Sequence, residues 1–593
     1  MSEAYGLAFA AAQGVMRADY RRGVLDALAS ASLKRPWALV GAALAVLAAA
    51  LAIAMLTTGG LGPGSTRVDE PAGADLVIET EEAADVPRKV SGVALATIAA
   101  NVEADPAVAS VSPAQTRPAR GTATMAVALE TDDDGARREA VARINADVDP
   151  GPLELHVSGE TTALLEAGSG LGEDLWRLEL LVIPVALLAL AGGLGARVGL
   201  AAAIAAATAI AGCLAGLGIG GAFADPTLLG AVPGIAVGLA LGIELPALMA
   251  ARLTDEARMG PPDSALRAAL ADGVWPLAFT AVAGVVASAG MLATGYGPAV
   301  SSVVAVALAV GFALLATLLA TPALFALELR ARGDAEESEA RGRLAEALSA
   351  APRGLARRPW RTAVAVVVAF AALLALAYPA HDAQSVPLGV AASDSLLDEL
   401  PLAAAVSAAA LGLAFVLRTR RLRSLVLGPT ALLPAGAACG LVALVFEDGT
   451  LLPSSAGGAG ALSNASVGAL AVALAAIGAA RTAAATEAVG FERALDPGPP
   501  GVAERAATAT AVAAVLGTLI AGAAAGVMLG ADLRAVQELG LGLAAGLLAD
   551  LLIARPASLA ALARWGAGTR TCGAPLTLRR WTLRRPATRD SAG

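Results

Sequence analysis

About twelve stretches of this sequence are apolar over the length of a membrane-crossing helix, and this pattern limits the fold more than any other feature. The composition of the 593-residue chain agrees, because 57% of its residues are hydrophobic and only 16% are charged. A mean hydropathy of +0.68 lies outside the range of soluble globular proteins. The sequence therefore predicts an α-helical protein that crosses the membrane many times. The predicted spans are residues 37–56, 178–194, 198–217, 227–251, 275–292, 300–324, 362–378, 402–417, 425–445, 467–480, 507–529 and 539–554.

Arginine residues collect at the ends of these spans on one side of the membrane. Arg197, Arg252, Arg330 and the cluster at 418–423 all fall on this side when the spans are counted in order. Cytoplasmic loops carry an excess of lysine and arginine, so this side is the cytoplasm. We therefore expect a multi-pass protein of the plasma or inner membrane with both termini in the cytoplasm.

A polar region between the first two spans, residues 57–172, is expected on the outer side of the membrane. Short alternating runs in it predict strands, and two longer amphipathic runs predict helices. Their order is β-α-β-β-α-β, which is the pattern of an α+β ferredoxin-like domain. The predicted strands are 76–79, 108–111, 124–129 and 153–157, and the predicted helices are 91–104 and DGARREAVARINADV after Asp133.

The sequence lacks the residue patterns that several classes of function require. A net charge of −9 and the lack of a basic stripe argue against nucleic acid as a partner. The three cysteines, Cys213, Cys439 and Cys572, are far from any CxxC spacing, so we expect neither a disulfide framework nor a zinc site. With only His156 and His381, histidine-based chemistry is also poorly supplied. We expect no enzyme activity, no cofactor and no metal.

A short motif of basic residues followed by proline and tryptophan occurs twice, each time before an apolar span. LKRPW occupies residues 33–37 and ARRPW occupies residues 356–360. Two copies about half a chain apart indicate a duplicated membrane unit, so the sequence predicts two pseudo-symmetric repeats. The predicted segments are a cytoplasmic N-terminal segment (1–36), the first transmembrane helix (37–56), the extracytoplasmic domain (57–172), helices two to six (178–327), a cytoplasmic linker (328–361), the second repeat (362–563) with a short extracytoplasmic loop near 379–400, and a cytoplasmic tail (564–593).

One carboxylate, Glu244, lies within the apolar span 227–251. An ionised group at bilayer depth costs several kcal/mol by most estimates, roughly 2.5–3.5 on insertion scales, so it marks a functional site by default. Four glycines at a spacing of four place a small-residue seam on one face of the same helix and let another helix approach closely. We expect the acid to lie inside protein beside this seam, and the partner of the seam to be the tenth span. The glycines are Gly230, Gly234, Gly238 and Gly242.

Several stretches carry motifs that occur together, in this order, in one group of transporters. The first is the basic-Pro-Trp opening of both repeats, and the next is SGETTALLEAGSGLGEDLWRLELLVIP before and within the second span. GLALGIELPALMAARLTDEARMG is similar to a glycine-rich fourth span with its cytoplasmic elbow. LGLGLAAGLLADLLIARPASLAALARWGAG is similar to a last span, in which Asp550 and Arg555 form a D-x4-R element. Over most of its length the chain resembles the MmpL branch of the resistance-nodulation-division (RND) transporter superfamily.

The resemblance implies export of lipids or related apolar molecules, driven by protons that pass through a relay in the membrane. The family has Asp-Tyr pairs on its fourth and tenth spans, and here Glu244 and Leu245 occupy the pair on the fourth span. Aligning AAIGAARTAAATEA with ALGIELPALMAARL by their glycines places Ala480 at the acid of the tenth span and Arg481 at its tyrosine. We therefore expect Glu244 to face Arg481, and Asp550 to share Arg481 or Arg555.

The chain also departs from the family after the seventh span. A typical member has a second extracytoplasmic domain there, but only PAHDAQSVPLGVAASDSLLDEL precedes the next span. A substrate tunnel between two such domains would have to be rebuilt by homo-oligomerisation, or be absent. This departure, together with the arginine in the tenth span, keeps open a second hypothesis, in which the protein does not transport but scaffolds or regulates an envelope-lipid complex.

Three interpretations of the intramembrane charges remain open on the sequence alone. In the first, Glu244 or Asp550 carries protons and ion-pair switching couples them to movement of the two halves. In the second, Glu244 forms a static ion pair that holds the repeats in register, because a carboxylate beside a guanidinium stays ionised. In the third, Arg481 reaches out from the end of its span and Glu244 lies near solvent.

Overall fold

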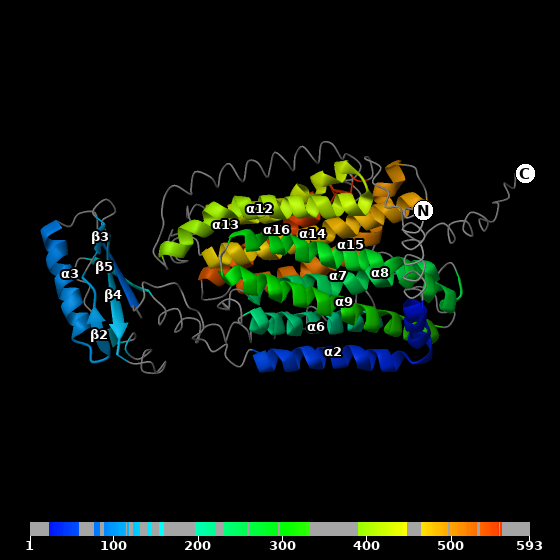
Figure 1. The fold of residues 1–593 in the computed structure, drawn as a ribbon, viewed down its shortest axis with the longest axis horizontal. Helices are drawn as coiled ribbons and strands as arrows, with labels where there is room; N and C mark the ends of the chain where they lie inside the picture. Colours follow the sequence, from blue (N-terminus) through cyan, green and yellow to red (C-terminus); the bar gives the residue numbers. More distant parts are fainter. Residues whose placement is uncertain are drawn as a thin grey trace, which may run out of the picture.

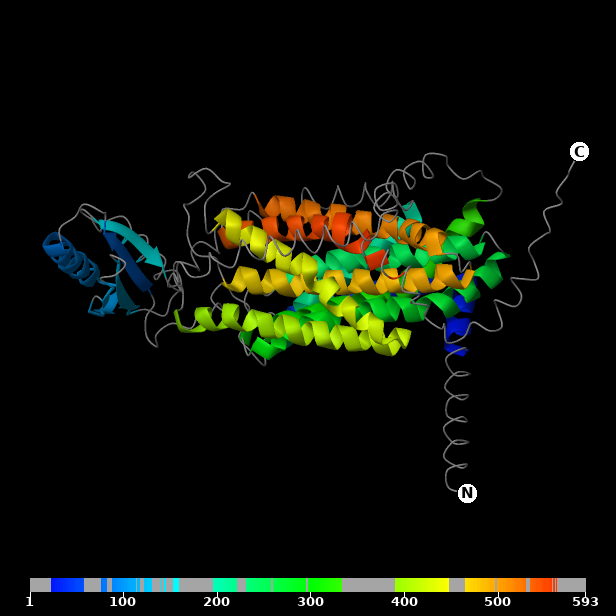
Figure 2. The same ribbon diagram turned by 90° about the horizontal axis from the view of Figure 1, so that it is seen from above.

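The computed structural model describes a bundle of long helices and a separate domain of strands, which lies beyond one end of the bundle (Figure 1). Figure 2, turned by 90°, shows the same separation along the long axis. The described residues are 23–57, 76–82, 88–113, 115–117, 122–130, 140, 143–144, 153–158, 196–220, 231–257, 260–294, 297–332, 390–446, 464–495, 499–529, 534–556, 558–559 and 562.

Ten helices in the described part of the chain are long and apolar enough to cross a membrane. They coincide with ten of the predicted spans, and the other two predicted spans, 178–194 and 362–378, lie outside the described residues. The chain is therefore a multi-pass membrane protein. The helices are α2 (Pro36–Thr57), α6 (Ala196–Gly220), α7 (Ala231–Ala257), α8 (Pro262–Ala289), α9 (Gly297–Arg332), α12 (Val390–Thr419), α13 (Leu427–Phe446), α14 (Asn464–Leu495), α15 (Pro499–Met528) and α16 (Arg534–Ala549), with shorter turns η2 (Gly290–Thr294), η4 (Leu422–Val426) and η6 (Asp550–Ala554).

Small residues let these helices approach closely. The hydrophobic effect does not drive apolar helices together in lipid, so close van der Waals packing must hold them. A Cβ added at Gly216 of α6 would lie 2.6 Å from the Cα of Ala305 in α9. In the same way, a Cβ at Gly220 would lie 2.8 Å from the Cα of Ser301. The frequent alanines and glycines of this sequence therefore have a packing role, in addition to making the spans apolar.

The central helices of the bundle are α14 and α7. In the most apolar stretch of each helix, 94% of the residues are buried in α14 and 78% in α7, whereas 22% are buried in α2 and 28% in α12. Polar side chains on α14 and α7 are therefore surrounded by protein, whereas α2 and α12 lie at the periphery.

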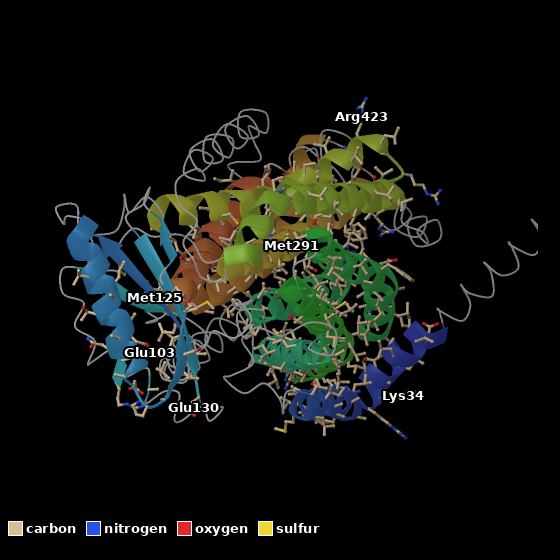
Figure 3. All side chains as sticks on the ribbon, turned by 60° about the vertical axis from the view of Figure 1, so that its left-hand side comes forward. Lys34, Glu103, Met125, Glu130, Met291 and Arg423 are labelled. Atoms are coloured by element: carbon tan, nitrogen blue, oxygen red, sulfur yellow. The ribbon has the colours of Figure 1, made fainter. Side chains whose placement is uncertain are left out.

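Figure 3 shows Lys34 and Arg423 at the end of the bundle away from the strand domain. These two cations thus lie opposite the strand domain, and the sidedness of the protein in the membrane stays a prediction.

The strand domain has an antiparallel sheet in the order β2-β4-β1-β5, and β3 pairs with β4. In the register, Ile78 of β1 lies between Met125 of β4 and Val157 of β5. This order is compatible with the predicted β-α-β-β-α-β arrangement, but most of its second helix lies outside the described residues. The elements are β1 (Leu76–Glu82), α3 (Arg88–Glu103), β2 (Val108–Val111), β3 (Gln115–Arg117), β4 (Thr122–Leu129) and β5 (Leu153–Ser158).

The core of this domain forms between α3 and the sheet. Ile98 and Val102 of α3 pack with Met125 and Val127 of β4, and Ile144 joins them from the predicted second helix. At the edge of this core the guanidinium of Arg143 donates to both carboxylate oxygens of Asp105 at 3.2 Å. That hydrogen-bonded cation holds the pKa of Asp105 below its usual value.

Candidate functional site: an ion-pair network among α7, α14 and α16

The guanidinium of Arg481 on α14 lies between two carboxylates in the middle of the bundle. Its Nε and Nη2 donate to Oε1 of Glu244 on α7, at 2.8 and 2.5 Å. Its Nη1 donates to Oδ2 of Asp550 at 2.8 Å. The exposed fractions of Glu244, Arg481 and Asp550 are 3%, 1% and 4%, so the network is closed to solvent in this structure. One cation thus ties together three helices that are far apart in the sequence.

Helix α15 also contacts the network, at both Arg481 and Glu244. Nη2 of Arg481 also donates to Oγ1 of Thr518 at 2.9 Å and to the carbonyl of Ala514 at 3.4 Å. Next to Thr518, a Cβ added at Gly517 would lie 2.5 Å from Oε1 of Glu244 and 2.8 Å from its Cγ. Only a glycine leaves room there for the carboxylate of Glu244 to face Arg481.

Both carboxylates lie close to an interruption of the regular α-helical hydrogen bonding in their helix. Pro246 lies inside α7, two residues after Glu244, and has no N–H to donate to the carbonyl of Gly242. Asp550 begins the π-helical turn η6 that continues α16. Single π-helical turns inside longer helices are frequent at functional sites. The backbone is thus locally weakened on the two helices that carry the acids, whereas α14 runs unbroken through Arg481.

Arg555 follows the same π-helical turn but does not join the network through a hydrogen bond in the described part of the chain. It is 4% exposed, and its Nη2 donates to the carbonyl of Thr510 on α15 at 2.6 Å. Its Nε and Nη1 have no hydrogen-bond partner among the described residues. Of the two arginines that we expected Asp550 to share, the structure pairs it with Arg481.

Removing one partner from such a network is costly. A buried pair that loses one member leaves an uncompensated charge, which costs about 3–5 kcal/mol. Here one guanidinium faces two carboxylates, so Glu244, Arg481 and Asp550 together carry one net negative charge when all three are ionised. Arg555 is a second buried cation one turn beyond Asp550. Counted with Arg555, the four buried charges sum to zero.

The structure brings together three of the four charged residues that the sequence predicted, and it excludes one interpretation. Arg481 lies in the middle of α14, which extends to Leu495, beyond the predicted span end at residue 480. Because Arg481 is 1% exposed, the interpretation in which it reaches out to solvent is wrong. The sequence did not indicate Gly517 and Thr518, because a glycine and a threonine in a span rich in both carry no distinguishing signal.

The glycine seam of α7 does not pack against the tenth span, and that prediction was wrong. A Cβ at Gly234 would meet the Sγ of Cys213 on α6, and a Cβ at Gly238 would lie 3.2 Å from the Cβ of Ala209. A Cβ at Gly242 would lie 2.5 Å from the Cα of Ala206. The seam therefore faces α6, and α7 turns a different face, with Glu244, toward α14. Gly230 lies outside the described residues.

A methyl group in this seam is expected to destabilise the protein. Gly242→Ala places the Cβ against the backbone of α6, which cannot yield as a flexible side chain can, so we expect a loss of about 1–3 kcal/mol. Gly311→Ala is the control, because nothing lies within 4 Å of its added Cβ and alanine favours a helix over glycine. Thermal unfolding in detergent measures both. Equal midpoints for the two variants would contradict the close packing of α7 on α6.

Similar folds occur among solved membrane proteins, although the sequences differ widely. SecDF in its super-membrane-facing form matches with a TM-score of 0.53 and 12% identity, covering 89% of this chain and 98% of that one. SecDF, a translocon-associated membrane protein from Thermus thermophilus, matches with a TM-score of 0.49 and 14% identity, covering 88% and 99%. The hedgehog release protein Disp from the water bear Hypsibius dujardini matches with a TM-score of 0.47 and 10% identity, covering 75% and 76%. No protein-family model and no curated protein matches the sequence.

The first of these similarities shows that the chain shares the overall fold of SecDF. At 12% identity it concerns the architecture alone, because the same fold carries different functions. The finer assignment to the MmpL branch, which the sequence motifs predicted, stays a prediction.

Proposed function

We propose that this protein is an RND-like transporter that moves a lipidic or apolar substrate outward across the plasma or inner membrane, coupled to protons. The observation that carries the proposal is the guanidinium of Arg481 shared between Glu244 and Asp550 in the buried middle of the bundle. A purely structural ion pair needs one acid, whereas two acids on different helices around one cation offer two alternative pairings. Charged groups at this depth are costly and generally serve a pathway or a coupling step.

The proposed coupling step is protonation of one acid of the network. When a proton forms an O–H bond at the carboxylate of Glu244, the two hydrogen bonds from Arg481 no longer join opposite charges, so they weaken. Arg481 then keeps its charged pair with Asp550 and its hydrogen bond to Thr518. The tie between α7 and α14 loosens, and α7 can shift relative to the second half of the bundle. Loss of the proton restores the pair and returns the helices.

Two further features fit this proposal. Helix α8 packs on α14, where a Cβ at Gly284 would lie 3.1 Å from the carbonyl of Ala476, and α15 packs on α7 at Gly517. The helix that follows α7 therefore packs on α14, and the helix that follows α14 packs on α7. Two pseudo-symmetric repeats would exchange helices in this way. The strand order of the separate domain fits a ferredoxin-like, porter-type domain on the outer side. We include both assignments in the proposal.

A non-transporting scaffold or regulator of an envelope-lipid complex is the alternative, and one observation favours it. Arg481 is held by Thr518 and Ala514 of α15 in addition to the two acids, so four groups fix its guanidinium. A cation held in this way can serve as a static lock that keeps the repeats in register.

Transport in proteoliposomes separates the two functions. The purified protein is reconstituted, its co-purified lipid is identified by mass spectrometry, and movement of that lipid is measured with and without a proton gradient. We expect gradient-dependent movement that Glu244→Gln reduces at least tenfold, a typical loss for one group of a proton-transfer pathway. Glu538→Gln is the matched control, because Glu538 is also buried on α16, at 1% exposed, but hydrogen bonds Ser466 instead of Arg481. Lipid movement that is the same with and without the gradient, and the same in Glu244→Gln as in the parent, would rule out proton coupling.

A further inference from the structure

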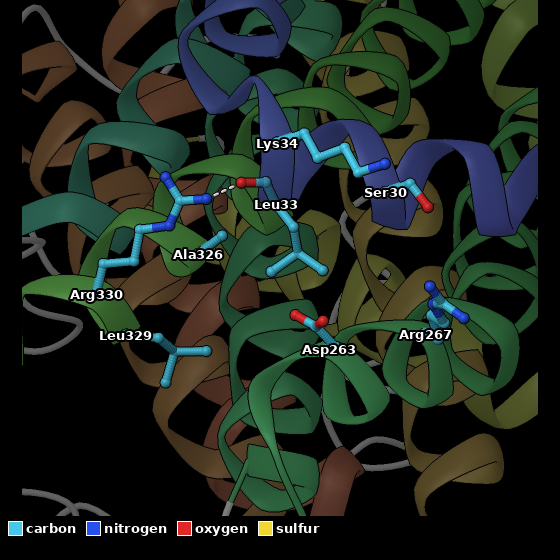
Figure 4. A pocket seen from close by; sticks show the side chains of 8 residues that line it. All are labelled: Ser30, Leu33, Lys34, Asp263, Arg267, Ala326, Leu329 and Arg330. Atoms are coloured by element: carbon cyan, nitrogen blue, oxygen red, sulfur yellow. Dashed lines mark hydrogen bonds between the residues drawn. The ribbon is translucent and has the colours of Figure 1, made fainter.

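A cavity of about 490 Å³ lies at the end of the bundle opposite the strand domain. It forms where the helix of residues 23–34 crosses the ends of α8 and α9 (Figure 4). Its volume falls within the usual range for small-molecule sites, about 300–1,000 Å³. The residues that line it are Ser30, Leu33, Lys34, Asp263, Arg267, Ala326, Leu329 and Arg330.

Three cations and one anion surround this cavity, so its charge is positive. Arg330 already has a partner, because its Nη2 donates to the carbonyl of Leu33 and ties the helix of residues 23–34 to α9. Lys34 and Arg267 form no hydrogen bond or ion pair with any described residue, and Asp263 lies beyond ion-pair distance of both. Two cations therefore face the cavity from different helices without a counter-ion in the described part of the chain.

Apolar side chains also line the cavity, among the charged ones. Leu33 lies between Lys34 and Arg330, and Ala326 and Leu329 lie on the side of α9. Trp37, three residues after Lys34 and at the start of α2, is 68% exposed. Exposed tryptophans at span ends mark the level of the lipid headgroups. The cavity thus combines cations and apolar side chains at the depth where a phospholipid changes from headgroup to acyl chain.

We propose that this cavity binds the phosphate-bearing headgroup of an anionic membrane lipid. Lys34 and Arg267 contact the phosphate oxygens, while Leu33 and Leu329 contact the glycerol and the first methylenes of an acyl chain. Basic pockets between helices on the cytoplasmic side suit anionic headgroups, and each cation near the surface adds about tenfold or less in affinity. The site lies at the end of the bundle, away from Arg481, so it stands whether or not the protein transports.

A soluble phosphate would satisfy Lys34 and Arg267 equally well, but it would leave the apolar lining residues without a contact. We therefore assign the site to a lipid, and free glycerol phosphate serves as the probe for the alternative source. The two cations also favour the binding of anionic lipids over zwitterionic ones, because a zwitterionic headgroup gains little from two unpaired cations.

Native mass spectrometry of the full-length protein in detergent tests this inference. Phosphatidylglycerol, phosphatidylcholine and free glycerol phosphate are titrated in turn. We expect phosphatidylglycerol to bind at least tenfold more tightly than the other two, and the double variant K34Q/R267Q to lose roughly tenfold or more of that affinity. Thermal unfolding of K34Q/R267Q without lipid checks that the variant is folded.

The matched control is the double variant R420Q/R423Q, which removes two exposed charges at the same end of the bundle but outside the cavity. It should bind phosphatidylglycerol as the parent does. Equal losses in the two double variants would show a general charge effect and would overturn the assigned site. Glycerol phosphate binding as tightly as the lipid would show that the site takes a soluble phosphate. Unchanged affinity in K34Q/R267Q would overturn the proposal as well.

Discussion

Replacing Arg481 by methionine is expected to destabilise the protein by about 3–5 kcal/mol and to abolish coupling. The variant leaves the carboxylates of Glu244 and Asp550 facing each other across a space in which neither has a cation to pair with. Both are less than 5% exposed, so water cannot replace the lost hydrogen bonds without opening the bundle. Unfolding by denaturant in detergent micelles measures the loss.

Two further variants separate the stability effect from the coupling effect. The quadruple variant R481M/E244Q/D550N/R555M carries none of the four buried charges of the site, and replacing a buried ionic cluster as a unit is often neutral or stabilising. We therefore expect it to recover most of the stability but none of the proton coupling. Arg505→Gln is the control, because its pair with Glu492 is partly exposed, at 38% and 13%, and surface pairs contribute about 0–1 kcal/mol. A similar loss in R481M and R505Q would contradict a buried network at Arg481.

Gly517→Ala is expected to have the second-largest effect, although it adds a single methyl group. The added Cβ would lie 2.5 Å from Oε1 of Glu244, the oxygen that accepts both hydrogen bonds from Arg481. The carboxylate must turn away, so the variant combines about 1–3 kcal/mol of overpacking with a weakened ion pair. We expect a lower unfolding midpoint and reduced gradient-dependent transport.

Gly522 on the same helix provides the matched control for this prediction. Nothing lies within 4 Å of a Cβ added at Gly522, and alanine is favoured over glycine in a helix by about 1 kcal/mol. Gly522→Ala should therefore leave the unfolding midpoint unchanged or raise it, with normal transport. Equal behaviour of the two variants would show that α15 does not press against Glu244.

Much of the membrane fold could be predicted from the sequence, because long apolar runs in lipid have few alternatives to helices. The facing positions of Glu244 and Arg481 were expected from the family resemblance, after the fourth and tenth spans were aligned by Gly242 and Gly478. The structure places these two side chains in contact. The two-repeat layout itself stays a prediction.

Other parts of the site could not be predicted, for physical reasons. A glycine spacing of four shows that some helix comes close, but not which one, and for α7 that helix is α6. Thr518 and Gly517 gain their roles only from the position of α15 against α7. The cationic cavity combines residues near positions 34, 267 and 330, which no local pattern connects.

Proton uptake by the Arg481 network is the most direct test of the proposed coupling. Infrared difference spectra of the reconstituted protein, recorded while the pH is lowered, reveal the carbonyl stretch of any carboxyl group that becomes protonated inside the bundle. We expect such a band in the parent and in Glu538→Gln, and its loss in Glu244→Gln or Asp550→Asn. No band at any pH at which the protein stays folded, or a band unchanged in both variants, would show that Arg481 forms a static lock.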